Sequence, residues 1–254
     1  MTTPRIELRN ISKTFKGVDR TVSALEDISF KVMPGEFVTI IGASGSGKST
    51  MFNICVGLLE PDDGEILLDG EKPENRAGML GYMPQRDLLL PWRNVLDNVL
   101  LPLEIQGIHR KEARQQALEM LPHFGLETFE NEYPSALSGG MRQRAALLRT
   151  WLMGRSTLLL DEPFGALDAL TRKELRNWLL RVWQEFERTV MFITHDVEEA
   201  VYLGDRVIVL STRPGNISHE LKIDLPRPRR QGMIAEPEFG KLVQKLLEQL
   251  GVDV

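Results

Sequence analysis

The sequence has few cysteines, no long apolar run and no surplus of basic residues. Its one cysteine, Cys55, excludes an intrachain disulfide and is typical of a reducing compartment, and its apolar surroundings indicate a buried, inert thiol. The net charge of −5 argues against a general nucleic-acid binder. The amino terminus lacks the apolar core of a signal peptide, and no window reaches the ~20 apolar residues of a membrane span. We therefore expect a cytoplasmic protein that does not itself cross a membrane.

The 254 residues suffice for one large domain or two small ones. Residues 5–70 contain short strands and one strong helix, whereas residues 94–152 are predominantly helical. In residues 156–211 the strands are continuously apolar, which is typical of parallel strands covered by helices on both faces. Residues 212–254 predict a strand and an amphipathic helix that form an appendage on the core.

A glycine-rich segment matches the phosphate-binding pattern G-x-x-x-x-G-K-[ST] between an apolar strand and a helix expected from Lys48 to about Leu58. Glycines let successive backbone N–H groups point at phosphate oxygens, and the helix start adds its positive dipole end. Lys48 is placed to reach the β- and γ-phosphates, and the Ser49 hydroxyl to bind Mg²⁺. A glycine turn that binds no nucleotide is the alternative. The predicted ATP-binding segment comprises Gly42, Ala43, Ser44, Gly45, Ser46, Gly47, Lys48, Ser49 and Thr50.

The segment LLLDEP places two carboxylates, Asp161 and Glu162, just past the end of a buried strand. Ligands of open α/β sheets bind at the carboxyl ends of the strands, so Asp161 is placed to hold Mg²⁺ opposite Ser49. Glu162 points elsewhere and suits the role of a base that positions an attacking water. The alternative is that both acids only cap a helix.

Two single side chains are further candidates for contact with a nucleotide. Phe15 could stack on adenine, or it could pack in the core as an ordinary strand residue. His195 follows the buried strand VMFIT at its carboxyl end, beside the expected phosphate site; a structural histidine is the alternative.

Five motifs together point to one family. The phosphate loop at 42–49 is followed by LSGGM at 137–141, LLLDEP at 158–163, GALD at 165–168 and THD around His195. This set resembles that of the nucleotide-binding subunit of an ABC transporter. One departure is Met141, where many relatives have glutamine; we expect phosphate contact to be unaffected, because it depends on the serine, the glycines and backbone N–H groups.

The resemblance implies an α/β fold: a P-loop NTPase core with a mostly parallel sheet, an N-terminal antiparallel β subdomain and an inserted α-helical subdomain. We expect the cassette to span 1–211, with the helical subdomain at about 86–152, and the appendage to span 212–254. The insertion agrees with the spacing of Lys48 and Asp161, which lie much further apart than one crossover helix requires.

The resemblance also implies roles for single residues. Phe15 falls at the adenine-stacking aromatic, Gln85 at the glutamine that senses Mg²⁺ and the membrane partner, and His195 at the switch histidine of the γ-phosphate. The signature Ser138, Gly139 and Gly140 would contact ATP held by a second copy, and Asp168 would end the dimer-contact loop. The predicted catalytic residues are Glu162, His195, Gln85 and Lys48, and the predicted metal-binding residues are Ser49, Gln85 and Asp161.

The activity implied by the resemblance is hydrolysis of ATP with Mg²⁺, coupled to import of a small solute. The implied partners are a second copy of the chain, integral membrane permease subunits and, indirectly, an extracytoplasmic solute-binding protein; nucleic acid is not expected. The chain would lie peripherally on the cytoplasmic side of the inner membrane. Longer segments resemble the nitrate, sulfonate and taurine importer branch, and also importers of a thiamine pyrimidine precursor. The alternative is a non-transport ABC-type ATPase acting on the ribosome or DNA.

The segment GYMPQRDLLLPWRNV has an unusual number of large apolar residues in a proline-broken loop. The run Leu88–Trp92 could pack into the helical subdomain, or it could form a hydrophobic seat for a short helix of a membrane subunit. Both interpretations remain open from the sequence.

Overall fold

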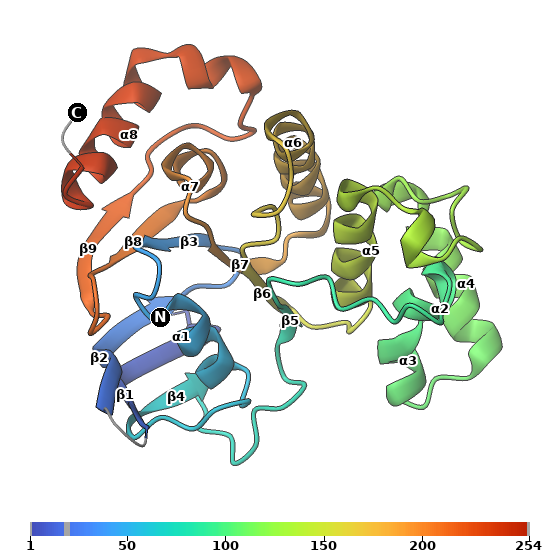
Figure 1. Ribbon diagram of the computed structural model, residues 1–254, viewed down its shortest axis with the longest axis horizontal. Coiled ribbons are helices and arrows are strands. Elements are labelled where there is room, and N and C mark those ends of the chain that lie inside the picture. Colours follow the sequence, from blue (N-terminus) through green and yellow to red (C-terminus); the bar gives the residue numbers. More distant parts are fainter. Residues whose placement is uncertain (1, 18–20, 253–254) are drawn as a thin grey trace.

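The computed structural model describes residues 2–17 and 21–252 and contains two β-sheets with helices packed around them (Figure 1). The smaller sheet is antiparallel and its strands have the order β2–β1–β4. The larger sheet has the order β5–β6–β7–β3–β8–β9 and is parallel except for β9. The strands are β1 Ile6–Lys16, β2 Thr21–Val32, β3 Phe37–Gly42, β4 Asp63–Leu68, β5 Gly81–Met83, β6 Thr157–Asp161, β7 Thr189–Ile193, β8 Arg206–Leu210 and β9 Ile217–Lys222. The α/β fold with two sheets expected from the sequence is confirmed.

The larger sheet is buried on both faces, which explains its continuously apolar strands. Alternate residues of β3 face opposite ways: Val38 and Ile40 pack with α1 and the smaller sheet, whereas Phe37 and Ile41 pack with helices of the other face. The helices of that other face include α6, α7 and α8 (Figure 1). The helices around the larger sheet are α1 Lys48–Cys55, α6 Ala169–Phe186, α7 Val197–Leu203 and α8 Pro237–Gln249.

A group of helices lies to one side of the larger sheet, on the right in Figure 1. It contains α2 Val95–Val99, α3 Leu101–Ile105, α4 Arg110–Met120 and α5 Gly139–Trp151, with short 3₁₀ turns at Pro122–Phe124 and Pro134–Ala136. The proline in the segment 94–107 predicts a break at Pro102, but the structure divides the segment at Leu100, between α2 and α3. Pro102 lies in the first turn of α3, where its missing N–H costs no hydrogen bond.

The helix after the phosphate loop, α1, ends at Cys55, three residues earlier than the sequence suggests. Gly57 adopts a left-handed backbone with φ +79°, and the N–H of Leu58 bonds to the carbonyl of Asn53. A left-handed glycine after the last turn is a common helix stop. The Cys55 thiol is buried, and burial raises its pKa to about 12, so it is the inert thiol predicted.

The carboxy-terminal segment forms β9, a 3₁₀ turn at Gln231–Ala235 and α8, and it packs on α7. Arg227 and Arg229 donate to carbonyls at the end of α7, at distances of 2.7 Å to Leu203 and 2.7 Å to Val201. These bonds satisfy acceptors that a helix end leaves unpaired, so the appendage is fixed to the core. No helix among the residues described here is long and apolar enough to cross a bilayer.

Candidate functional site

The phosphate loop joins the carboxyl end of β3 to the start of α1. The buried Lys48 ammonium folds back over the loop and donates to the Gly42 carbonyl at 2.8 Å and the Ala43 carbonyl at 3.0 Å. Burial lowers the pKa of Lys48, and the nearby carboxylates of Glu162 and Asp161 oppose this shift. The ammonium therefore lies in a pocket where an anionic phosphate would stabilise its charge.

The loop requires glycine at position 47 for two reasons. Gly47 has φ +91°, a conformation that side chains disfavour, and an added Cβ would lie 2.5 Å from Cδ2 of Leu25 and 2.7 Å from the carbonyl of Ala24. Because both contacts are with β2, the smaller sheet packs directly against the phosphate loop. The two sheets therefore hold the loop between them.

A cavity of about 480 Å³ covers the loop. It brings the predicted adenine contact Phe15, whose side chain is 41% exposed, to the same space as the loop. The cavity is lined by Phe15, Val22, Ala24, Ser44, Gly45, Ser46, Gly47, Lys48, Ser49, Thr50, Gln85, Glu162 and Arg213. A larger cavity of about 910 Å³ near Arg188 lies at the starts of β3 and β7 and contains none of the predicted residues.

Asp161 ends β6 and is 3% exposed. Burial raises the pKa of its carboxyl, the adjacent Glu162 raises it further, and the Ser49 hydroxyl opposes the shift. Its Oδ1 is buried without a hydrogen-bond partner. The unpaired buried carboxylate oxygen and the neighbouring Ser49 hydroxyl are hard oxygen donors, and the Gln85 side chain, which lines the cavity together with Ser49, has an amide oxygen as a third; these residues fit Mg²⁺.

Three predicted catalytic side chains meet at Glu162, which lines this cavity together with Gln85. Gln85 donates from Nε2 to Oε2 of Glu162 at 3.1 Å, and Nδ1 of His195 lies 3.6 Å from the same oxygen. Glu162 has a left-handed backbone with φ +45°, which turns its side chain away from that of Asp161. The carboxylate thus faces a glutamine and a histidine, and Glu162 also lines the cavity over the phosphate loop.

The turn that carries His195 is fixed by a buried acid that the sequence reasoning missed. The Thr194 hydroxyl donates to Oε2 of Glu199 at 2.5 Å, and the Asp196 carboxylate caps α7 by accepting from the N–H of Glu199 at 3.0 Å. Burial raises the pKa of Glu199 to about 7. The sequence contained one signal for this role: an acidic residue, Glu199, within the largely apolar segment that follows THD.

The signature residues lie elsewhere. Ser138 caps α5, its hydroxyl accepting from the N–H of Met141 at 3.3 Å, and none of Ser138, Gly139 and Gly140 lines the cavity over the loop. A Cβ added at Gly140 would lie 2.9 Å from a methyl group of Thr171 on α6, so close helix packing requires glycine there. Within one chain the structure does not bring the signature to the phosphate loop.

Asp168, at the end of the GALD segment, caps α6. Its carboxylate accepts from the N–H groups of Leu170 at 3.1 Å and Thr171 at 3.0 Å. The hydrogen bond from the Thr171 backbone is the main reason why the pKa of Asp168 is lowered. Its side chain is exposed.

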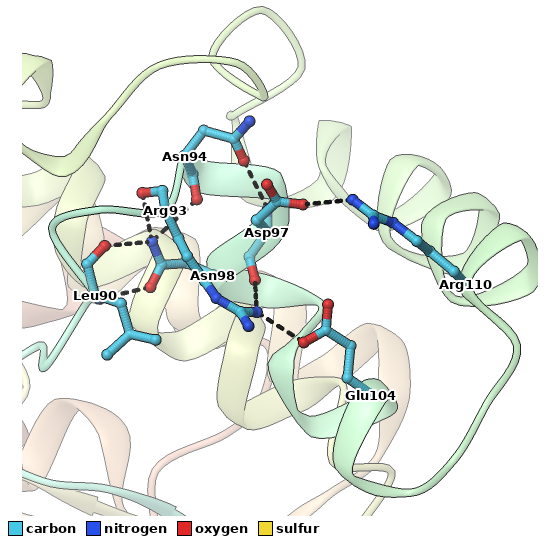
Figure 2. A network of polar contacts seen from close by, with 7 residues as sticks. All are labelled: Leu90, Arg93, Asn94, Asp97, Asn98, Glu104 and Arg110. Atoms are coloured by element: carbon cyan, nitrogen blue, oxygen red, sulfur yellow. Dashed lines mark hydrogen bonds and ion pairs between the residues drawn. The ribbon is translucent and has the colours of Figure 1, made fainter.

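The apolar loop after Gln85 is held by a polar network (Figure 2). Buried Asn98 donates to the carbonyls of Leu90 at 3.1 Å, Arg93 at 2.9 Å and Asn94 at 3.0 Å, and its Oδ1 accepts from the N–H of Leu90 at 2.7 Å. One amide side chain thus contacts four backbone groups of the loop and, among the residues described, is the only partner of two of them, the N–H of Leu90 and the carbonyl of Arg93, which fixes the shape of the loop.

The loop is also tied to the signature helix. Arg149 of α5 donates to the carbonyls of Asp87 at 2.5 Å and Leu88 at 2.7 Å. Leu89 is buried, whereas Leu88 and Trp92 are 56% and 72% exposed. The run predicted as core or docking surface therefore divides: Leu89 packs inward, whereas Leu88 and Trp92 at its two ends face outward.

The comparisons with known proteins agree with this geometry. A family model described as ABC transporter matches residues 25–165, more than half of the chain. The formylaminopyrimidine import ATP-binding protein ThiZ of Halalkalibacterium halodurans is 48% identical over 190 residues, which cover 75% of this chain and 74% of that protein. The taurine import ATP-binding protein TauB of Rhizobium johnstonii is 42% identical over 232 residues, covering 89% and 88%.

Solved structures extend the comparison. The ATP-binding cassette MJ0796, solved as a dimer in a post-hydrolysis state bound to ADP and Pi, superposes with a TM-score of 0.75. It is 34% identical in sequence, and the match covers 87% of this chain and 100% of that chain.

Proposed function

Because the chain belongs to the ABC transporter family as an ATP-hydrolysing, ATP-binding subunit, we propose that it powers import of a small solute through separate integral membrane subunits. The observation that carries the proposal is that Lys48, Gln85 and Glu162 line the cavity over the phosphate loop and that Glu162 also faces His195. The relatives are named for import of taurine and of formylaminopyrimidine. We propose a solute of the nitrate, sulfonate and taurine class or of the thiamine-precursor class, recognised by other subunits.

The residues around the cavity suit different roles in ATP binding and hydrolysis. The loop N–H groups and Lys48 bind the phosphates, and Phe15 stacks on adenine. Ser49, Gln85 and Asp161 would hold Mg²⁺, which supplies charge neutralisation at the phosphate oxygens when bound. Glu162 orients the attacking water and accepts its proton, and His195 donates to the γ-phosphate.

The isolated position of Ser138, Gly139 and Gly140 supports a site shared between two copies. In a head-to-tail pair, each signature would contact the ATP held by the other phosphate loop, with Asp168 at the contact between the copies. The positive end of α5 suits a phosphate there. The ATP-closed pair would lie on the cytoplasmic side of the inner membrane, and an extracytoplasmic solute-binding protein would deliver the solute.

Leu88 and Trp92 support a docking role for the loop after Gln85. Both are exposed and apolar, and the network around Asn98 holds the loop in one conformation, which lowers the entropy cost of binding. We propose that a short helix of a membrane subunit packs on them.

Mixing two inactive variants tests the shared site. Lys48→Ala removes the phosphate ligand, and Ser138→Arg blocks the signature, so each variant alone should hydrolyse ATP at least about 10²-fold more slowly than the unmodified chain. A mixed pair contains one site with Lys48 and Ser138 both intact. Recovered ATP hydrolysis on mixing is the expected result. Activity equal to the average of the two separate variants would contradict the shared site.

A further inference from the structure

The turn between β8 and β9, residues 211–216, brings a second cation to the nucleotide cavity. Arg213 lines that cavity together with Phe15 and the phosphate loop. Its Nε donates to the carbonyl of Gly45 at 3.2 Å, on the outer side of the loop. Sequence reasoning assigned this turn only to the appendage.

The turn is held beside the phosphate loop by hydrogen bonds to β2 and by a close backbone contact. Gly215 donates to the carbonyl of Ala24 at 3.0 Å and accepts from the N–H of Glu26 at 2.9 Å, both on β2. A Cβ added at Gly215 would lie 2.0 Å from the carbonyl oxygen of Ser46. The turn therefore packs directly on the phosphate loop, and this contact fixes the position of Arg213 relative to the loop.

The charge of Arg213 is uncompensated within the described part of the chain. Its side chain is exposed and no carboxylate there forms an ion pair with it, whereas Arg206 at the start of β8 pairs with both Glu36 and Glu220. Since Nε is engaged with Gly45, the two Nη groups remain for another acceptor. A guanidinium is the side chain best suited to phosphate oxygens.

We propose that Arg213 binds a phosphate oxygen of ATP through its Nη groups and is a phosphate-binding residue additional to the loop. This inference rests on the proposed function, because it assumes that the cavity holds ATP. The guanidinium would approach the triphosphate from the side opposite α1, so that cations of two separate segments face the same anion.

Arg213→Gln tests this role, because a glutamine amide reaches the position of Nε and still donates to the Gly45 carbonyl without a charge. The matched control is Arg110→Gln, a surface substitution at a side chain that is 80% exposed. Calorimetric titration with ATP at low and high salt should show about tenfold weaker binding for Arg213→Gln, the range of one charge-assisted hydrogen bond. Arg213→Lys should recover most of the affinity, and high salt should shrink the difference.

An unchanged dissociation constant for Arg213→Gln would overturn the inference. An equal loss in the Gln and Lys variants that salt does not alter would also overturn it, because it would mean that Arg213 only supports the loop backbone. If the unmodified chain bound no ATP while remaining folded, the proposed function itself would fail. Lys48→Ala, titrated in the same experiment, shows how much ATP affinity is lost when a residue of the phosphate loop is removed.

Discussion

Replacing Glu162 by glutamine is the sharpest test of the chemistry. The glutamine side chain has nearly the same size, and its amide oxygen is able to accept the hydrogen bond that Gln85 Nε2 now donates at 3.1 Å. The amide has no basic oxygen, so it does not accept a proton from water. The substitution therefore removes one chemical property and leaves the surrounding contacts in place.

The expected magnitude follows from that single loss. General base catalysis contributes roughly 10²- to 10⁴-fold, so the turnover number should fall by that factor, or about 3–5 kcal/mol in the activation barrier. ATP binding should be retained or become tighter, because one negative charge beside the triphosphate is removed. Thermal stability should change little, since Glu162 is a partly exposed group and its glutamine replacement keeps the hydrogen bond from Gln85.

Phosphate release, the dissociation constant for ATP and the elution volume with ATP would be measured on purified protein. Glu185→Gln is a matched control, since that acid is half exposed on α6 and its partner is His123. The variant at Glu162 should form an ATP-trapped dimer. A turnover number within about threefold of the unmodified chain would remove Glu162 from the role of base.

Three further changes probe separate parts of the molecule. Asn98→Leu leaves two backbone groups of the apolar loop, the N–H of Leu90 and the carbonyl of Arg93, without a partner in the described part of the chain. It should lower the free energy of unfolding by about 3 kcal/mol in urea titrations, whereas a loss below about 1 kcal/mol would show that water replaces the amide. Leu88→Ser with Trp92→Ser should abolish stimulation of ATP hydrolysis by the reconstituted membrane subunits while basal hydrolysis persists; unchanged stimulation would refute docking there. The raised pKa of Glu199, about 7, means that the folded state binds its proton more tightly than the unfolded state. This group should therefore cost stability progressively between about pH 4.5 and 7, by about 3 kcal/mol in all, and Glu199→Gln should remove that slope in unfolding titrations at several pH values.

The parts of the site that the sequence predicted are those encoded locally. The phosphate loop and the acids after β6 are short continuous segments at the ends of apolar strands, and the parallel sheet places strand ends together. The family pattern predicted Gln85 and Glu162 as site residues but not their contact; they are 77 positions apart in the sequence, and the structure places Nε2 of Gln85 3.1 Å from Oε2 of Glu162.

Other contacts had no local signature. The run Leu88–Leu90 lacks any periodicity, so the sequence does not show which leucine is buried; in the structure Leu88 has a left-handed backbone, with φ +47°, and Leu89 is the buried one. The role of Asn98 depends on a loop folding back over its own helix, and Arg213 meets Gly45 only because β8 is adjacent to β3. Such contacts arise from tertiary packing, which a pattern along the chain does not contain.

The bonds from Arg149 to the apolar loop have a mechanical consequence. The helix α5 has 13 residues and is therefore a stiff rod of about 20 Å, with Ser138 at one end and Arg149 near the other. A force on the loop would tilt α5 as a whole rather than bend it, so that the end of the helix at Ser138 would move as well. A displacement of the loop by a docked partner would therefore also displace the signature residues, because both are attached to the same helix.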